Sequence, residues 1–395
     1  MTAPQRPAAD ELVARARALA PALLERVAEA DSLRRLPDAT IDDLKTAGLF
    51  RVLQPARWGG YEHDPRTFYE CQIALARGCA STAWVYGVLG VHAWQLALFP
   101  EEAQREVWGA DDSTLLSSSY APTGKVERVT GGFEVSGRWS FSSGCDHAAW
   151  AFLGGFAPTP PDAKAPDMRT FLVPKTDYRI EDTWHVMGLK GTGSKDVVID
   201  RCFVPEHRTH KLIDGFKRSS PGNELNPAPL YRLPFGQVFV RSVSTTALGV
   251  AENALDAYRK VAAQRIAAGD GKKVADDPTA QIAAAEAEAL IDEARTILLR
   301  DMDELMSLAR AGADMPIERR IKLRYDSSRL VDKCVEAVDG LFSASGGRAI
   351  FLASPMLRHF LDVHTARAHY ANNPDKPGRN HGAVQLQLKN TDFFL

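Results

Sequence analysis

The stretch with the clearest capacity for chemistry is Gly137–His147, GRWSFSSGCDH, in which Trp139 precedes Ser142, Ser143 and Gly144. A large aromatic side chain among small hydroxyl residues at the end of a strand suits a flat, polar ring as the ligand. The aromatic residue covers one face of such a ring, while hydroxyl groups and a closely approaching backbone reach its heteroatoms. An ordinary β-hairpin with serines in its turn accounts for the same residues. These residues alone leave both interpretations open.

Histidines are the other candidates for acid–base chemistry, because they titrate near neutral pH. His92 lies in the apolar stretch 81–99, STAWVYGVLGVHAWQLALF, which predicts a helix buried in a bundle or at a subunit contact. In such a helix a histidine is more often a hydrogen-bonded core residue than a ligand. His359, His364 and His369 lie close together in sequence, but their spacing around a helix does not require a shared site.

Three segments with different hydrophobic patterns must position these residues. The segment 1–112 places apolar residues at helical spacing, 113–210 alternates with a period of two, and 211–395 is helical again. We therefore predict a mainly α protein with an N-terminal helical domain, a small central β-barrel or sandwich, and a C-terminal four-helix bundle with a connecting loop and tail. The bundle helices are expected at 238–262, 277–311, 316–342 and 355–372, with irregular chain after Pro374.

The composition excludes several classes of function. The 395 residues are 45% hydrophobic and 25% charged, as in an ordinary globular protein, and the formal net charge of −2 gives no reason to expect a nucleic acid or a membrane as partner. No apolar run is long enough to span a bilayer, and the first residues lack the pattern of a signal peptide, so a cytoplasmic location is expected. The five cysteines are scattered without the spacing of metal ligands, so no metal site is expected.

The order of domains and several motifs together resemble the acyl-CoA dehydrogenase family over essentially the whole chain. The N-terminal motifs are LPDATIDDLKTAGL at 36–49 and Trp58-Gly59-Gly60. The C-terminal motif is Gly346-Gly347 followed by PMLR at 355–358. The resemblance implies the helix–sheet–bundle fold of that family.

Within this superfamily the sequence is most similar to the reduced-flavin-dependent aromatic hydroxylases, which are oxygenase components of two-component monooxygenases. They include the hydroxylases of a steroid-derived phenol and of 4-hydroxyphenylacetate. Where most dehydrogenases carry a Tyr-Glu-Gly whose carboxylate removes a proton, this chain has His369-Tyr370-Ala371, so that carboxylate is missing. The segments that carry the similarity are QPARWGG (54–60), GVHAWQLALF (90–99), SSSYAP (117–122), SSGCDHAAW (142–150), GLKGTGS (188–194) and ARAHYANNP (366–374).

The similarity implies a monooxygenase that hydroxylates a phenolic, polycyclic or indolic substrate with O2 and reduced flavin, FADH2 or FMNH2. A separate reductase would supply the flavin, a C4a-hydroperoxide of the flavin would deliver the oxygen, and the protein would be a homotetramer. Alternative hypotheses are a flavin oxidoreductase of the acyl-CoA dehydrogenase type, a sulfur or nitrogen monooxygenase of the same fold, and a non-catalytic scaffold. The missing carboxylate argues against the dehydrogenase.

The similarity also implies roles for individual residues. His369 would be the base that removes the phenolic proton, and Ser142 or Ser143 would lie near flavin N5, with the choice depending on strand register. Trp139 would lie against the isoalloxazine ring. The other expected cofactor contacts are Ser119, Tyr120, Arg265, Gly346 and Gly347, with Lys272 and Lys273 as further cations for the flavin phosphate. The other expected substrate contacts are Trp84, His92, Tyr120 and Tyr370.

Overall fold

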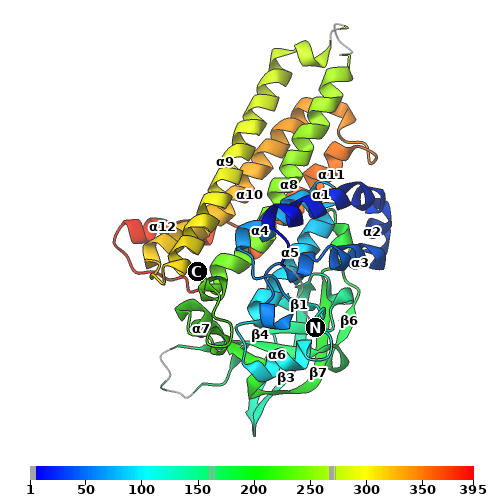
Figure 1. The fold of residues 1–395 in the computed structure, drawn as a ribbon. Helices are drawn as coiled ribbons and strands as arrows, with labels where there is room; N and C mark the ends of the chain where they lie inside the picture. The colour runs from blue at the N-terminus through cyan, green and yellow to red at the C-terminus, as the bar shows by residue number, and fades with distance from the viewer. Residues whose placement is uncertain (1–5, 160–161, 163–164, 267–270, 272) are drawn as a thin grey trace.

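The computed structural model describes residues 6–159, 162, 165–266, 271 and 273–395, and it confirms a mainly α fold with a β domain (Figure 1). A layer of N-terminal helices lies between the β domain and a bundle of long C-terminal helices. Within the described ranges, no helix combines the length and the apolar character needed to cross a bilayer. The N-terminal helices are α1 (Ala9–Glu25), α2 (Val27–Leu33), α3 (Asp38–Thr46), α4 (Pro65–Ala76), α5 (Ala80–Leu96) and α6 (Glu101–Trp108).

Every residue of α5 is buried, as its uniformly apolar sequence predicts. The helix packs against α4 and α8 on the bundle side and against β1 on the side of the β domain. Small residues allow this close packing: a Cβ on Gly87 would lie 2.6 Å from the main-chain oxygen of Ser242 in α8. The residues of α5 can therefore face either of the two halves of the molecule.

The β domain consists of two four-stranded sheets, one with the strand order β1-β4-β5-β8 and the other with the order β2-β3-β7-β6. β1 runs parallel to β4, and the other pairings are antiparallel. Aromatic and β-branched side chains from both sheets fill the core between them. The strands are β1 (Leu116–Ser119), β2 (Lys125–Val129), β3 (Gly132–Ser142), β4 (Trp150–Ala157), β5 (Asp167–Pro174), β6 (Arg179–Glu181), β7 (Lys195–Pro205) and β8 (Thr209–Lys211).

The bundle is built around α8, which packs against α4, α5, α9, α10 and α11. The two longest helices, α8 and α9, extend away from the β domain (Figure 1). The helices of this region are α7 (Leu212–Lys217), α8 (Phe235–Gln264), α9 (Pro278–Arg310), α10 (Ile317–Ser345), α11 (Pro355–Arg367) and α12 (Asp375–Gln385).

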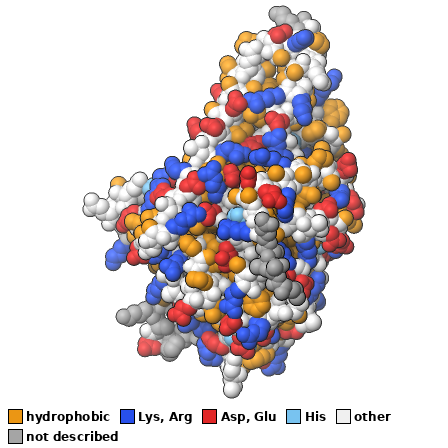
Figure 2. All heavy atoms as spheres, viewed as in Figure 1, with side chains coloured by type: hydrophobic (Ala, Val, Ile, Leu, Met, Phe, Trp, Pro, Cys, Tyr) orange, Lys and Arg blue, Asp and Glu red, His pale blue; other side chains and the backbone are white. Residues whose placement is uncertain are grey.

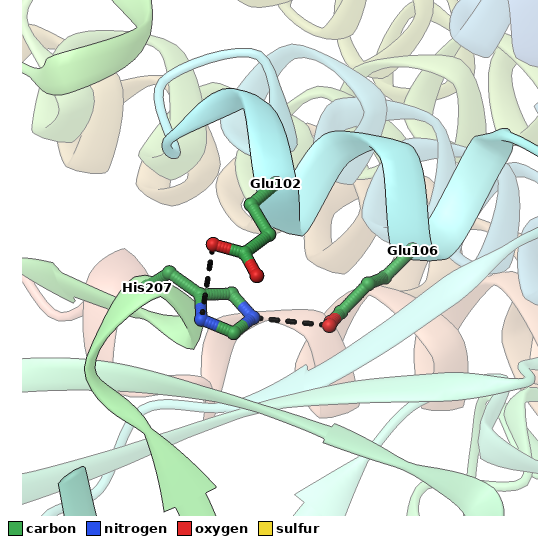
Figure 3. A group of neighbouring side chains, drawn as sticks. All are labelled: Glu102, Glu106 and His207. Atoms are coloured by element: carbon green, nitrogen blue, oxygen red, sulfur yellow. Dashed lines mark hydrogen bonds and ion pairs between the residues drawn. The ribbon is translucent and has the colours of Figure 1, made fainter. Parts of the chain in front are cut away.

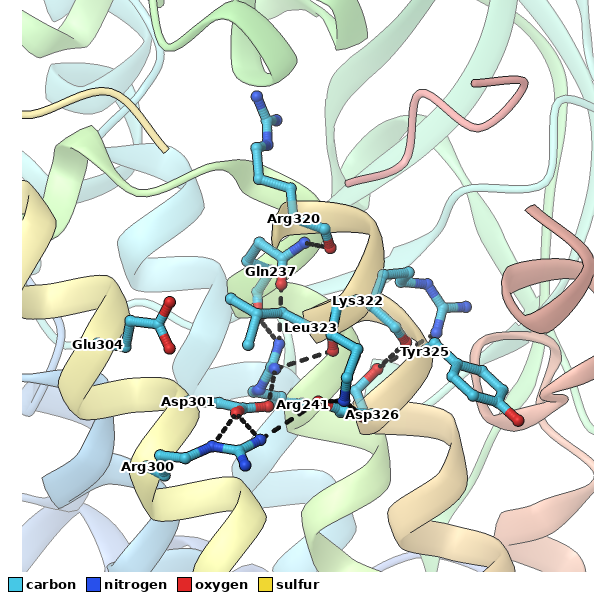
Figure 4. Close-up of polar contacts among 12 residues, drawn as sticks. Gln237, Arg241, Arg300, Asp301, Glu304, Arg320, Lys322, Leu323, Tyr325 and Asp326 are labelled. Carbon is cyan, nitrogen blue, oxygen red and sulfur yellow. Dashed lines mark hydrogen bonds and ion pairs between the residues drawn. The ribbon is translucent and has the colours of Figure 1, made fainter. Parts of the chain in front are cut away.

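A buried ion pair links three of the bundle helices (Figure 4). The guanidinium of Arg241 donates to Asp301 at 3.0 Å and to the main-chain oxygen of Leu323 at 3.0 Å, and it also contacts Gln237. Arg300 donates to the other carboxylate oxygen of Asp301. Because almost every polar atom of this pair has a partner, its burial is stabilised by hydrogen bonds as well as by charge.

Two features of the fold differ from the sequence-based expectation. Helix α11 ends at Arg367 rather than near residue 372, because the chain turns at His369 into a short 3-10 helix. The tail that was expected to be irregular after Pro374 contains α12. On the face shown in Figure 2, basic and acidic side chains alternate over the bundle and the β domain, in keeping with the formal net charge of −2.

Candidate active site

Strand β3 ends in an irregular turn that changes the direction of its side chains. The pairing register with β7 shifts between Trp139 and Ser142, and Phe141 takes a φ of +66°. Gly144 follows with a φ of +69°, and a Cβ on it would lie 3.1 Å from the side chains of Val85 and Leu89 in α5. The turn therefore needs glycine at 144, and it places this end of β3 directly against α5.

The two serines of this turn point to different neighbours. Ser142 Oγ donates to Ser117 Oγ of β1 at 3.1 Å. Ser143 Oγ accepts from Trp84 Nε1 at 3.0 Å and lies 2.7 Å from Ser194 Oγ. Ser194 Oγ lies 2.8 Å from Thr192 Oγ1, which gives a buried chain of hydroxyl groups that starts at Trp84. Of the two serines, Ser143 is therefore the one connected to the predicted substrate side.

The loop 188–194 supplies the last two hydroxyl groups of that chain and is fixed at three points. Leu189 N donates to Asp362 of α11 at 2.6 Å, and Gly191 N donates to Ser81 Oγ of α5 at 3.2 Å. Thr192 O accepts from Gly144 N at 2.9 Å. The glycine-rich loop is thus a backbone turn that joins α5, α11 and the end of β3, and not a dinucleotide-binding motif.

Trp139 does not line the site, which corrects its expected place against a flavin ring. The side chain is fully buried between the two sheets, and its Nε1 donates to Gly154 O at 2.8 Å. Phe141, two residues later, is 70% exposed and meets Trp184 edge-on, with 6.2 Å between ring centroids. Phe141 with the half-buried Trp184, directly beside Ser142 and Ser143, is the part of this turn that can cover a planar ring.

His92 lies at the inner face of α5, against β1. Its Nδ1 lies 2.7 Å from Leu116 O, and since a carbonyl oxygen only accepts, Nδ1 must carry the proton. Nε2 is then an acceptor, and it is buried with no hydrogen-bond partner among the described residues. Burial lowers the pKa of His92 to about 4, so the ring is neutral at physiological pH.

Tyr120 and Gln95 extend the surroundings of His92. The Tyr120 ring lies 6.3 Å from the His92 ring, and its hydroxyl donates to Gln95 Oε1. Gln95 Nε2 is buried without a partner among the described residues. Ser119 Oγ donates to Ser140 O at 2.7 Å, so it ties β1 to β3 with its hydroxyl group. One unpaired donor and one unpaired acceptor therefore lie in the same buried region.

His369 reaches the site from the bundle side. Its ring meets Trp84 edge-on at 5.6 Å, so it belongs to the neighbourhood of Ser143. Its Nδ1 accepts from Ala371 N at 3.1 Å, so the proton of the neutral ring is on Nε2. Burial and the nearby charge of Arg324 lower the pKa of His369 to about 4. Asn372 holds this turn by donating to Val243 O of α8 at 3.0 Å.

The hydrogen bonds of His369 do not favour the role of base that the sequence predicted for it. The lone pair of Nδ1 is used by a backbone N–H, and Nε2 is a donor. Tyr370, the next residue, is 65% exposed and accepts from Lys376 Nζ at 2.9 Å, so its hydroxyl lies at the surface.

The residues expected to bind the outer part of the cofactor lie elsewhere. Arg265, at the end of α8 remote from the β domain, donates to Ser345 O at 2.6 Å. A Cβ on Gly346 would lie 3.7 Å from the same guanidinium, so these two residues are neighbours. Gly347 follows in the same turn, with open space around it. Lys273 is exposed, and Lys272 lies outside the described residues.

A histidine with two carboxylates lies on the outer side of the molecule, between α6 and the end of β7 (Figure 3). His207 Nε2 lies 3.0 Å from Glu106 and Nδ1 lies 3.5 Å from Glu102. Arg208 also donates to Glu106, with 2.5 Å between the atoms. The cation of Arg208 already balances Glu106, so these contacts join α6 to the β domain as ordinary ion pairs.

Several residues of the site escaped the sequence analysis. Gln95 lies one turn beyond His92 on the same buried helix, and that spacing is a signal that could have revealed it. Phe141 and Ser194 lie within quoted segments, 137–147 and 188–194, but their roles, like that of Arg324, depend on contacts between remote segments. The described residues fit a flavin with a substrate beside it: the aromatic pair Phe141 and Trp184 for a ring face, hydroxyl groups next to it, and buried polar atoms of His92 and Gln95 that have no partner among the described residues.

Comparisons with known proteins show the family of the chain. The N-terminal domain of the acyl-CoA dehydrogenase family matches residues 6–111, and its C-terminal domain matches residues 242–374. The chain is 42% identical over 379 residues to the flavin-dependent monooxygenase oxygenase subunit HsaA of Rhodococcus jostii (strain RHA1), covering 96% of this chain and 99% of that protein.

Two further similarities support the same assignment. The chain is 36% identical over 388 residues to the oxygenase component of the FADH(2)-dependent resorcinol hydroxylase of Rhizobium sp. (strain MTP-10005), covering 96% of this chain and 94% of that protein. The crystal structure of 3-HSA hydroxylase from Rhodococcus sp. RHA1 has a TM-score of 0.93 at 40% identity, covering 98% of this chain and 99% of that one. The chain therefore belongs to the acyl-CoA dehydrogenase family and, within it, to the oxygenase components of flavin-dependent monooxygenases.

Proposed function

We propose that this protein hydroxylates a phenol with O2 and reduced flavin, and that His92 accepts the phenolic proton. The observation that carries this proposal is the Nε2 of a neutral histidine that has no hydrogen-bond partner in the described part of the chain and is fixed by Leu116 O in a buried, aromatic environment. Reduced flavin supplies the electrons that activate oxygen. Removal of the phenolic proton makes the ring electron-rich, which is what attack on an activated oxygen requires.

His369 acts as a hydrogen-bond donor through Nε2. Two features support this role. The backbone N–H of Ala371 occupies Nδ1, and the positive charge of the nearby Arg324 disfavours protonation of the ring. Its contact with Trp84 places it beside the hydroxyl chain rather than beside His92. His369, the donor, and His92, the acceptor, then bind different groups. The role of base, which the sequence predicts for His369, is assigned to His92.

Ser143 accepts a hydrogen bond from the N5–H of the reduced flavin, because it is the serine joined to Trp84 and Ser194. Ser142 instead supports β1 through Ser117. Phe141 and Trp184 cover one face of the flavin ring, taking the place expected for Trp139. The isoalloxazine thus lies at the end of β3.

The protein acts as a homotetramer in which the distal end of one bundle completes the cofactor site of another copy. Arg265, Gly346 and Gly347 lie remote from Ser143 within one chain, which supports a role for them at a second copy. An exposed apolar run follows them: Ile350, Phe351 and Leu352 are 66%, 65% and 95% exposed. Sedimentation velocity tests this, and a monomer at micromolar concentration would contradict it.

A separate flavin reductase provides the reduced cofactor, which is the arrangement implied by the term oxygenase component in the relatives' names. The protein functions in the cytoplasm. All five of its cysteines are free and buried, as suits a reducing compartment.

The test is turnover of purified protein with a reductase, NADH, flavin and a panel of phenols under 18O2. The expected result is a product heavier by one 18O atom. A dehydrogenase would instead give a product without new oxygen, and a scaffold would give none; either result would reject the proposal.

A further inference from the structure

Four aromatic side chains pack in a continuous cluster that begins beside His92, here called the aromatic wall: Tyr120, Phe239, Phe235 and Phe394. The rings of Phe235 and Phe239 stack with 5.7 Å between centroids and planes 7° apart. Tyr120 meets Phe239 at 4.8 Å and 82°, and Phe394 meets Phe235 at 5.6 Å and 74°. Tyr120 also meets Phe235 at 5.7 Å, and Phe394 also meets Phe239 at 6.1 Å, so each of these two rings contacts both stacked rings. Of the four rings, Tyr120 is the one that lies beside His92.

Phe394 is held in the aromatic wall by contacts of its backbone. Asp392 Oδ1 accepts from Phe394 N at 3.0 Å, and Arg320 donates to the main-chain oxygen of Leu395 at 2.5 Å. A Cβ on Gly236 would lie 2.6 Å from the main-chain carbon of Phe394, so the segment passes directly over α8. The Phe394 ring itself is only half-buried. The position of the ring thus depends on the anchored backbone.

We propose that Phe394 determines how long an aromatic substrate the site accepts, an inference that rests on the proposed function. When the phenolic hydroxyl of the substrate lies at His92, the first ring of the substrate lies along Tyr120 and Phe239. A second substrate ring would reach the position of Phe394. Removing the side chain of Phe394 opens space for that second ring. A hydrophobic pocket discriminates by about 10- to 200-fold for each methylene of misfit, so the effect is measurable.

The test is isothermal titration of the protein with phenol and with 4-phenylphenol, under anaerobic conditions and in the presence of reduced FAD. Phe394→Ala is expected to raise the affinity for 4-phenylphenol relative to phenol by about ten-fold. Gly236→Ala, which displaces the Phe394 backbone without changing an aromatic residue, is expected to shift the ratio in the same direction. Thermal unfolding of each variant confirms that it is folded.

Phe393→Ala is the matched control, because this neighbouring ring is 55% exposed and packs on Phe216 outside the wall. It should leave the affinity ratio unchanged. An unchanged ratio in folded Phe394→Ala, or failure of the wild type to bind either phenol, would overturn the inference. Product formation is measured separately: a shifted ratio without any hydroxylated product would reject the proposed function and leave the role of Phe394 standing.

Discussion

His92 and His369 approach the candidate site from opposite sides of the molecule, and their rings are hydrogen bonded in opposite senses. His92 gives its Nδ1 proton to Leu116 O, which leaves Nε2 as an acceptor. His369 receives the N–H of Ala371 at Nδ1, which leaves Nε2 as a donor. The pKa of each is lowered to about 4, mainly by burial, so both rings are neutral at pH 7.

The difference between the two histidines shows that a backbone neighbour decides what a neutral imidazole can do. Similar pKa values give no distinction between base and donor, whereas the partner of Nδ1 does. The bundle core differs in degree: Arg241 pairs with Asp301 and with the backbone and keeps only Nε without a partner among the described residues. In the candidate site, His92 Nε2 and Gln95 Nε2 both lack such a partner.

Replacing His92 should have the largest effect. His92→Ala removes the acceptor for the phenolic proton, so product formation should fall by about 10²- to 10⁴-fold, as for loss of a general base. Oxygen consumption should continue, with hydrogen peroxide replacing the product. Product is measured by chromatography and peroxide by a coupled assay.

The matched control is His359→Gln, because His359 is also buried and also has its pKa lowered to about 4 by burial, but lies in α11. It should retain most product formation if it remains folded. A comparable loss of product in both variants would show that the effect of His92→Ala is structural.

Replacing His369 should have a smaller effect that depends on the new side chain. A glutamine can still donate through its amide, so His369→Gln should keep product formation within about three-fold, while His369→Ala should lose about ten-fold, the value of one hydrogen bond. Turnover numbers at saturating phenol provide the measurement. A fall in turnover of more than a hundred-fold in His369→Gln would show that His369, and not His92, is the base.

The sequence predicted the long elements of the fold because their periodicity is local. Helices α8, α9 and α10 lie within a few residues of the expected ranges, since each repeats apolar residues over many turns. Helix α12 was missed because Pro377 and Gly378 interrupt its pattern, although a proline in the first turn needs no hydrogen-bond donor. The edge strands β6 and β8 are too short to show alternation.

The site was harder to predict than the fold, because its chemistry depends on contacts between remote segments. Trp139 was assigned to the ligand although it is a core residue, because the register shift after it puts Phe141 outside instead. The choice between Ser142 and Ser143 needed the position of Trp84. The tautomers of the two histidines depend on main-chain groups of β1 and of residue 371, which no side-chain pattern encodes.

The two serines offer a finer comparison. Ser143→Ala breaks the chain from Trp84 to Ser194 and should raise the fraction of oxygen released as peroxide by about five-fold, which corresponds to one hydrogen bond. Ser142→Ala leaves that chain intact and should change the fraction much less. Peroxide and product are measured in the same reaction mixture. An equal rise in both variants would show that the turn responds as a unit and that Ser143 has no separate role.

The smallest expected effect is the most discriminating one. Burial is the main cause of the lowered pKa of both histidines, but the charge of Arg324 lowers the pKa of His369 further, whereas the Leu116 carbonyl partly opposes burial at His92. In Arg324→Gln the pKa of His369 should therefore rise somewhat above about 4, because burial still lowers it, while the pKa of His92 stays in place.

Both histidines are neutral above their pKa, and protonation as the pH falls removes the lone pair that a base needs. If His92 is the base, the acid limb of kcat/KM for hydroxylation stays near pH 4 in the wild type and in Arg324→Gln alike. If His369 is the base, the acid limb of kcat/KM moves to higher pH in Arg324→Gln, because His369 with a raised pKa is already protonated at that higher pH. Arg329→Gln, which removes a more exposed cation from the same helix, is the control that should leave the limb in place under either assignment. His369 keeps its Nε2–H whether the ring is neutral or protonated. A raised pKa at His369 therefore leaves a hydrogen-bond donor intact, whereas it would reduce the fraction of His369 able to act as a base.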